Sequence, residues 1–160
     1  MGKYFKMSRH FDKQTPEEFG LVYFDKHSAI DPKDSSIWLS KSMFDYGWGK
    51  ENGYVKTPIP DFEALYKIML NGTNDEDIYG AASVLLELYP EELLVKCEEM
   101  TDNPALEDDL LRVDHIIELS TPVNRCSTIG KTITELYSDY QRWRKIASYI
   151  SNIKRPDTSL

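Results

Sequence analysis

The sequence predicts a mainly α-helical protein, in which antiparallel helix hairpins form an array behind an irregular or short-β N-terminal segment. Residues 61–153 contain several apolar patterns with a helical period, and helix stop and start signals separate them. Residues 1–60 instead contain turn-forming residues and short β-prone runs. A chain of 160 residues can bury one self-sufficient core. We therefore expect a single domain over residues 1–160, with residues 1–60 as a cap and residues 61–160 as the helical array.

Two β-prone runs stand out in the N-terminal segment. Gly20 is followed by Leu-Val-Tyr-Phe, and Ser36 is followed by Ile-Trp-Leu-Ser. Residues 31–36, rich in Asp and Ser, separate the runs and predict a loop. The pair Asn52-Gly53 predicts a tight turn. The neighbouring glycines lack the Gly-Lys-Ser/Thr of a phosphate loop and open no helix, so nucleotide binding is not expected.

Large aromatic residues are concentrated in the same segment. Aromatic side chains with polar tips are favoured at interfaces, so they can form a recognition surface. They can equally cover the open end of a helical array, which such arrays require. The residues are Trp38, Phe44, Tyr46, Trp48 and Tyr54.

The first predicted helix begins after Asp61, a suitable N-cap, and ends at Asn71-Gly72. The strongest helical signal follows, from Thr73 to Met100. Thr73 and Glu76 have the spacing of a capping box, and Pro90 ends one helix and begins the next. Helices joined by so short a turn are expected to lie side by side and antiparallel.

Two further helices are predicted towards the C-terminus. Asn103-Pro104 begins the first and Pro122 closes it. The second runs from about Thr128 to Ile153 and has the most regular apolar period in the chain. Its stripe can pack as the last layer of the array or remain partly exposed for a partner.

A second copy of the central pattern follows the first at an offset of 31 residues, which is in the range of helical repeat arrays. Small residues at 80–82 would also permit close approach of another helix. The residues that carry the pattern are Asp77, Gly80, Ala81, Ala82, Leu85, Leu86, Leu88, Leu93 and Leu94. Through them the chain resembles HEAT and armadillo-like repeat proteins over about a third of its length. The second copy departs from the pattern at Asp109 and Arg112, where the first has Ile78 and Ala81.

Charge is distributed unevenly along the chain. Residues 61–118 contain sixteen Asp and Glu but only three Lys and Arg, whereas residues 1–60 have a net charge of +1 and residues 119–160 of +4. The acidic block would repel nucleic acid, whose binding depends on neutralising phosphates. It would attract a basic protein and accelerate association with it. The alternative is that the acidic helices are simply solvated.

No catalytic or metal-binding motif is evident. Cys97 lies on an apolar helix face among glutamates, which would raise the pKa of a buried thiol and make it unreactive. Cys126, Asp114 and His115 complete the only plausible nucleophile set. The three histidines are scattered, so neither zinc nor another cofactor is expected.

In size, acidity and helical character the chain resembles bacterial immunity proteins, small inhibitors that occupy the active site of a cationic toxin, often a nuclease. The resemblance implies a basic protein partner, such as a nuclease toxin, and an acidic helical face that binds it. The implied contact residues are Asp75, Glu76, Asp77, Tyr79, Glu98, Glu99, Asp102, Glu107, Asp108 and Asp109.

Two alternatives remain open. One is a scaffold or adaptor that holds a peptide or a second copy of the chain. The other is a hydrolase with a carboxylate pair, although Glu98-Glu99 and Asp108-Asp109 are adjacent and point to different sides of a helix. No membrane span, secretory leader or disulfide framework is evident, so a soluble cytoplasmic protein is expected, with its oligomeric state open.

Overall fold

The computed structural model describes residues 2–45 and 50–154, but not the side chains of Phe44, Asp45 and Lys50. These residues form an α+β fold with a five-stranded antiparallel sheet and five α-helices, so the predicted mainly α-helical hairpin array is wrong. The error arises in residues 1–60, whose strands are too short or too polar to give a clear period-2 pattern. The chain divides into two compact units, Met1–Val84 and Leu85–Leu160, which we describe separately.

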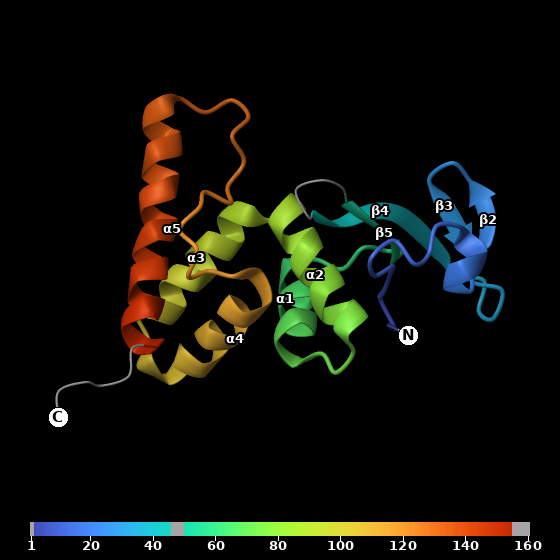
Figure 1. The fold of residues 1–160 in the computed structure, drawn as a ribbon, viewed down its shortest axis with the longest axis horizontal. Coiled ribbons are helices and arrows are strands. Elements are labelled where there is room, and N and C mark those ends of the chain that lie inside the picture. The colour runs from blue at the N-terminus through green and yellow to red at the C-terminus, as the bar shows by residue number, and fades with distance from the viewer. Residues whose placement is uncertain (1, 46–49, 155–160) are drawn as a thin grey trace. The chain divides into compact units, whose positions relative to one another are not determined.

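The first unit contains the sheet. Its strands lie in the order β1-β5-β4-β3-β2, and every neighbouring pair is antiparallel. Figure 1 labels strands β2 to β5 of this sheet. The two β-prone runs are confirmed as strands, since they fall in β2 and β4. The strands are β1 (Phe5–Met7), β2 (Val22–Asp25), β3 (Ser28–Ile30), β4 (Ile37–Asp45) and β5 (Lys50–Lys56).

The predicted turn at Asn52-Gly53 is wrong, because both residues lie inside β5. Gly53 pairs with Met7 on one side and with Lys41 on the other. A Cβ atom on Gly53 would lie 2.5 Å from Cγ of Met43. Glycine is therefore needed here for close packing, not for a reversal of the chain.

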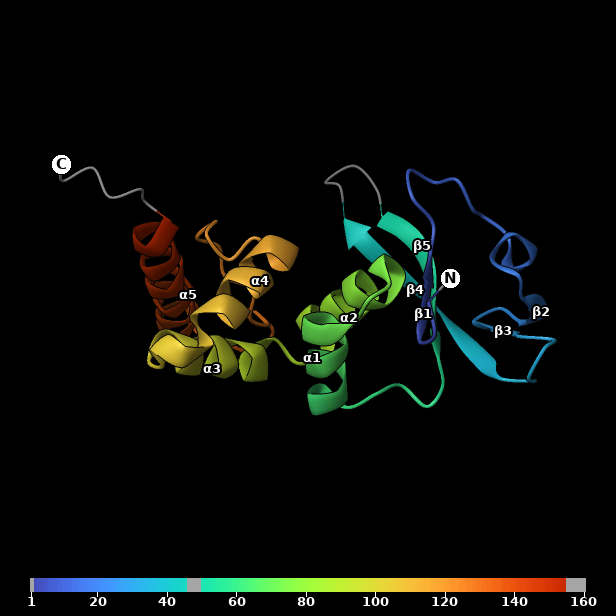
Figure 2. The same cartoon turned by 90° about the horizontal axis from the view of Figure 1, so that it is seen from below.

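Helices α1 (Phe62–Asn71) and α2 (Asp75–Leu88) lie beside strands β1, β5 and β4 (Figure 2). Asp61 is the N-cap of α1 as predicted, and its carboxylate accepts a hydrogen bond from Ala64 N at 2.9 Å. Gly80 of α2 does not meet another helix. It receives the ring of Phe5 from β1, and an added Cβ would lie 2.3 Å from Phe5 Cγ.

The predicted capping box at Thr73 and Glu76 is also wrong. Asn74 caps α2 instead, since its side-chain oxygen accepts from Glu76 N and its carbonyl accepts from Ile78 N. Glu76 is thereby left to bond elsewhere.

The other face of the sheet has a small core of its own, formed by Phe19, Leu21, Ala29, Trp38 and Tyr54. Phe19, from the short 3-10 turn η1 (Pro16–Phe19), meets Tyr54 edge to face with 5.2 Å between ring centroids. Trp38 and Tyr54 are thus buried core residues. Tyr46 and Trp48, and the side chain of Phe44, lie outside the described residues.

The second unit contains α3 (Pro90–Thr101), the 3-10 turn η2 (Pro104–Leu106), α4 (Glu107–Ile117) and α5 (Ile133–Lys154). Helix α3 packs against both α4 and α5. Pro90 begins α3, and Asn103 accepts a hydrogen bond from Ala105 N, as the capping signals predict.

The last two helices are shorter than predicted. Helix α4 ends at Ile117, because Glu118 adopts a left-handed conformation with φ of 56°. The guanidinium of Arg125 then donates hydrogen bonds to the carbonyls of Glu118, Thr121 and Val123. Helix α5 begins at Ile133 and not near Thr128. A reciprocal capping box between Thr132 and Glu135 starts it.

The apolar stripe of α5 is only partly covered. Trp143, Ile146 and Ile150 are buried, whereas Ile133 is 86% and Tyr137 63% exposed. Within residues 2–45 and 50–154, no helix combines the length and apolar character needed to cross a membrane.

We expect Gly80→Ala to lower the free energy of unfolding by about 1–3 kcal/mol, because the new methyl group overlaps the Phe5 ring. Helix propensity alone would predict a gain of about 1 kcal/mol. Urea denaturation of Gly80→Ala, of Phe5→Ala and of the double variant Phe5→Ala/Gly80→Ala tests whether the overlap with the ring causes the loss. The cost of Gly80→Ala should vanish once the ring is removed, and strictly additive effects would contradict the packing explanation.

Candidate partner-binding site

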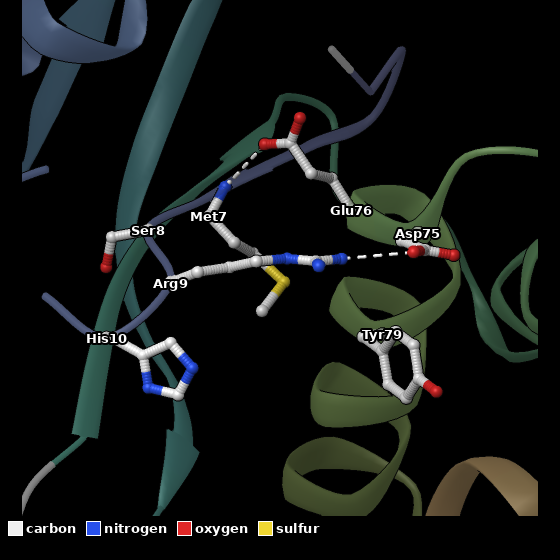
Figure 3. Close-up of a pocket in the computed structure, with 7 residues that line it drawn as sticks. All are labelled: Met7, Ser8, Arg9, His10, Asp75, Glu76 and Tyr79. Atoms are coloured by element: carbon white, nitrogen blue, oxygen red, sulfur yellow. Dashed lines mark hydrogen bonds and ion pairs between the residues drawn. The ribbon is translucent and has the colours of Figure 1, made fainter. Parts of the chain in front are cut away.

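Three of the predicted contact residues line a pocket of ≈ 320 Å³ in the first unit. Asp75, Glu76 and Tyr79 project from the first turns of α2, and residues 7–10 form the opposite wall (Figure 3). That wall consists of Met7, Ser8, Arg9 and His10. The pocket therefore contains carboxylates on one side and cationic or titratable groups on the other.

Hydrogen bonds from the end of β1 and from the chain that follows it hold this wall in place. Met7 N donates to Oε2 of Glu76 at 2.8 Å, and the Arg9 guanidinium pairs with Asp75 at 3.1 Å. Both members of the Arg9–Asp75 pair are more than 60% exposed, so the pair contributes little to stability. Beyond it, Phe11 N donates to the fully buried carboxylate of Glu51. The segment is thus fixed at both ends, whereas the ion pair across the pocket is weak and exchangeable.

Asp77 faces the protein interior. It is only 7% exposed, and its carboxylate accepts from the backbone N of Lys3, Tyr4 and Phe5 at 2.9–3.0 Å. Its role is to hold the N-terminal strand, so it is not available to a partner. The remaining predicted residues all belong to the second unit.

Those residues lie at the corner between α3 and α4. The last turn of α3 contains Glu98 and Glu99, Asp102 follows as its C-cap, and the first turn of α4 contains Glu107, Asp108 and Asp109. Residues 98–109 include no Lys or Arg. We call this stretch the acidic corner. In the described part of the chain, no ion pair involves Glu99, Asp102 or Asp108, and all three are exposed.

Glu98 of the acidic corner, in contrast to these three, is neutralised by an ion pair. Its carboxylate accepts two hydrogen bonds from Arg142 of α5, one of them from Nε at 2.9 Å. The pair raises the pKa of Arg142. Arg142 and Glu98 line a second cavity of ≈ 300 Å³ together with Thr101, Asp102, Lys145, Ile146 and Tyr149. Helix α5 contributes the basic residues of this cavity, Arg142 and Lys145, and the acidic corner contributes the carboxylates of Glu98 and Asp102.

The cysteines have no reactive surroundings. Cys97 is fully buried, and burial raises the pKa of its thiol to about 12. Cys126 is buried against Trp143, whose Nε1 donates to its sulfur at 3.4 Å, and burial raises its pKa as well. Among the described residues, no cluster of three His, Cys, Asp or Glu could hold a metal ion.

Asp114, the buried carboxylate of α4, serves the fold. Burial alone would raise its pKa, but hydrogen bonds from Lys154 and from Ser120 N hold the pKa below its ordinary value. The carboxylate thereby joins the end of α4 to the end of α5.

Arg9, His10, Arg142 and Lys145 were not predicted as site residues. The first two follow a strand of only three residues, whose pairing partner β5 lies some 50 positions later. Arg142 and Lys145 lie on α5, where the regular apolar period predicted a helix but gave no indication of what its charged residues contact. No local pattern places any of them next to the carboxylates they face.

No protein-family model matches this chain. Comparison with curated proteins and with solved structures likewise finds no significant match.

We expect Asp77→Asn to lower the free energy of unfolding by about 1–3 kcal/mol, because an amide group replaces a carboxylate that accepts from three buried or partly buried N–H groups. Asp75→Asn is the matched control in the same helical turn. Its exposed ion pair should contribute less than about 0.5 kcal/mol. Urea denaturation of both variants tests the assignment, and equal losses would contradict it.

The stability of the chain in acid is expected to depend on Asp114. Because the pKa of Asp114 is depressed in the folded state, its stabilisation is present above the unfolded pKa of about 4 and is lost as pH falls through the lower folded value. We therefore expect Asp114→Asn to be less stable than the parent at neutral pH and to lose less stability below about pH 4. Chemical denaturation at a series of pH values measures both slopes. Asp108→Asn, at an exposed position, serves as control. If the free energy of unfolding of the parent and of Asp114→Asn changed with pH in parallel, Asp114 would not be the group responsible.

Proposed function

We propose that this chain is a protein-binding module that uses the acidic corner to bind a basic protein, in the manner of an immunity-type inhibitor of a cationic toxin. The observation that carries the proposal is the set of exposed carboxylates at Glu99, Asp102 and Asp108, which have no ion-pair partner in the described part of the chain.

The position of two of these carboxylates favours a function outside the fold. The C-terminal end of a helix carries partial negative charge, so Glu99 and Asp102 at the end of α3 are each unfavourable by about 0.3–1 kcal/mol. No basic residue lies in that turn to compensate. A basic partner would relieve this repulsion on binding, and the same charge would increase the rate of encounter.

The pocket beside α2 supports the proposal in a second way. Asp75 pairs with the exposed guanidinium of Arg9, and Tyr79 lies beside it (Figure 3). An arginine or lysine from a partner can replace Arg9 there at little cost in stability, because the internal pair is weak. Aromatic residues next to such a position are common contributors to protein interfaces.

The first experiment is a pull-down from host lysate with the tagged protein at about 50 and about 500 mM salt, which correspond to weak and strong charge screening. We expect a basic protein that is retained at low salt and largely lost at high salt. If that protein is a nuclease, stoichiometric addition of the chain should inhibit it. Retention that does not depend on salt would contradict an electrostatic mechanism.

Charge reversal then locates the surface. We expect Asp102→Lys/Asp108→Lys to weaken binding of the captured partner at least about tenfold and to flatten its salt dependence. The matched control is Glu63→Lys/Glu92→Lys, which changes net charge equally at exposed positions outside the acidic corner. Equal effects of the two variants would mean that net charge alone governs binding, and an unchanged affinity for the first would exclude the acidic corner.

One observation favours an adaptor function instead. The exposed residues Ile133 and Tyr137 leave an apolar strip on α5, which could hold an amphipathic segment of a partner. In that case Ile133→Ser/Tyr137→Ser should abolish capture, whereas Asp102→Lys/Asp108→Lys should not affect it.

A further inference from the structure

Two cavities of the first unit share the side chain of Arg9 as part of their walls. One is the pocket of ≈ 320 Å³ beside α2, and the other has a volume of ≈ 400 Å³. Both are also lined by Met7, Asp75 and Glu76. Figure 3 shows Arg9 reaching from the chain after β1 across to Asp75 on α2. Arg9 therefore fills space that would be open to both cavities if its side chain moved away.

The two carboxylates of these cavities are only partly used by the fold. Asp75 accepts a hydrogen bond at Oδ2, from the Arg9 guanidinium at 3.1 Å, and Glu76 accepts from Met7 N through Oε2. In the described part of the chain, Oδ1 of Asp75 and Oε1 of Glu76 accept no hydrogen bond. The N-terminus of α2 carries a partial positive charge of about +0.5, which is smaller than the two negative charges. The free oxygens therefore favour a cation.

Arg9 indicates which cation fits this position. Its guanidinium makes one of the two parallel hydrogen bonds that a carboxylate can accept from a planar fork, and its side chain remains 63% exposed. Tyr79 lies four residues after Asp75, on the same face of α2, and its ring lines the pocket (Figure 3). A guanidinium can pair with a carboxylate and stack on an aromatic ring, whereas an ammonium group is a compact and more strongly hydrated ion.

We propose that the pocket beside α2 is a binding site for an arginine side chain of a protein partner, and that Arg9 occupies this site in the free chain. The incoming guanidinium donates two hydrogen bonds to Asp75 and lies against Tyr79, while Arg9 turns outward into solvent. The site is therefore self-inhibited by a residue of its own wall. This inference rests on the proposed function in that the partner is basic, but it does not involve the acidic corner.

An NMR titration of the ¹⁵N-labelled full chain with N-acetyl-arginine amide, up to about 50 mM, tests the proposal. We expect the largest chemical-shift changes at residues 7–10 and 75–79, with a dissociation constant in the millimolar range. N-acetyl-citrulline amide has nearly the same shape without the charge and should not bind. N-acetyl-lysine amide should bind at least about threefold more weakly. Absence of shift changes in the pocket, or equal binding of the citrulline compound, would overturn the proposal.

Variants separate competition by Arg9 from a change in net charge. Arg9→Ala should tighten binding of N-acetyl-arginine amide about two- to fivefold, because the weak internal pair no longer competes. Lys13→Ala is the matched control: it removes the same charge from the second cavity, but Lys13 pairs with Asp12 and not with Asp75. Asp75→Asn should weaken binding at least about tenfold. An equal gain in Arg9→Ala and Lys13→Ala would overturn the assignment of Arg9 as the competitor.

The acidic corner can be tested separately. Asp102→Lys/Asp108→Lys should change the affinity for N-acetyl-arginine amide by less than about twofold. If this variant loses the captured partner while the parent chain shows no pocket titration, the proposed function stands and the arginine site is excluded. If Asp75→Asn loses the partner and the corner variant retains it, the arginine site stands and the acidic corner is excluded.

Discussion

The first unit depends on one carboxylate. Asp77 accepts three backbone hydrogen bonds from residues 3–5, which are 72 to 74 positions away in the chain. These bonds hold β1 on the sheet, and β1 in turn places Phe5 against Gly80. A strand of three residues cannot be stable by its own pairing, so the helix provides what the short ladder lacks. The first turn of α2, the β1 edge of the sheet and the contact between Phe5 and Gly80 therefore all depend on Asp77.

This arrangement divides the many carboxylates of the chain into two groups. Asp77, Glu76, Glu51 and Asp114 are directed inward and accept backbone or side-chain hydrogen bonds. In the acidic corner, by contrast, Glu99, Asp102 and Asp108 are exposed and have no ion pair within the described part of the chain. Net charge alone does not separate these groups, because both contribute equally to it. What separates them is the presence or absence of a donor, and that is a property of the fold.

Local signals in the sequence were reliable where one residue acts on its neighbours. Asp61 as a cap, Pro90 as a helix start and the runs in β2 and β4 are confirmed. Predictions failed where a distant segment decides the outcome. Gly80 packs against Phe5 of strand β1 and not against another helix. Gly53 lies inside β5, where the absence of a side chain leaves space for Met43. The pocket beside α2 was not predicted for the same reason. Asp75, Glu76 and Tyr79 were expected as partner contacts, but Arg9 and His10 lie opposite them only because β1 pairs with β5.

The distance between β1 and Asp77 along the chain also has a consequence during synthesis. Phe5 of β1 can donate its hydrogen bond to Asp77 only after 72 more residues have been translated. At a rate of about 5–20 residues per second, this takes roughly 4 to 15 seconds. During that interval the N-terminal strand and its apolar Phe5 lie exposed on the nascent chain, within reach of chaperones. The contacts between β1 and α2 can therefore form only after α2 has been synthesised.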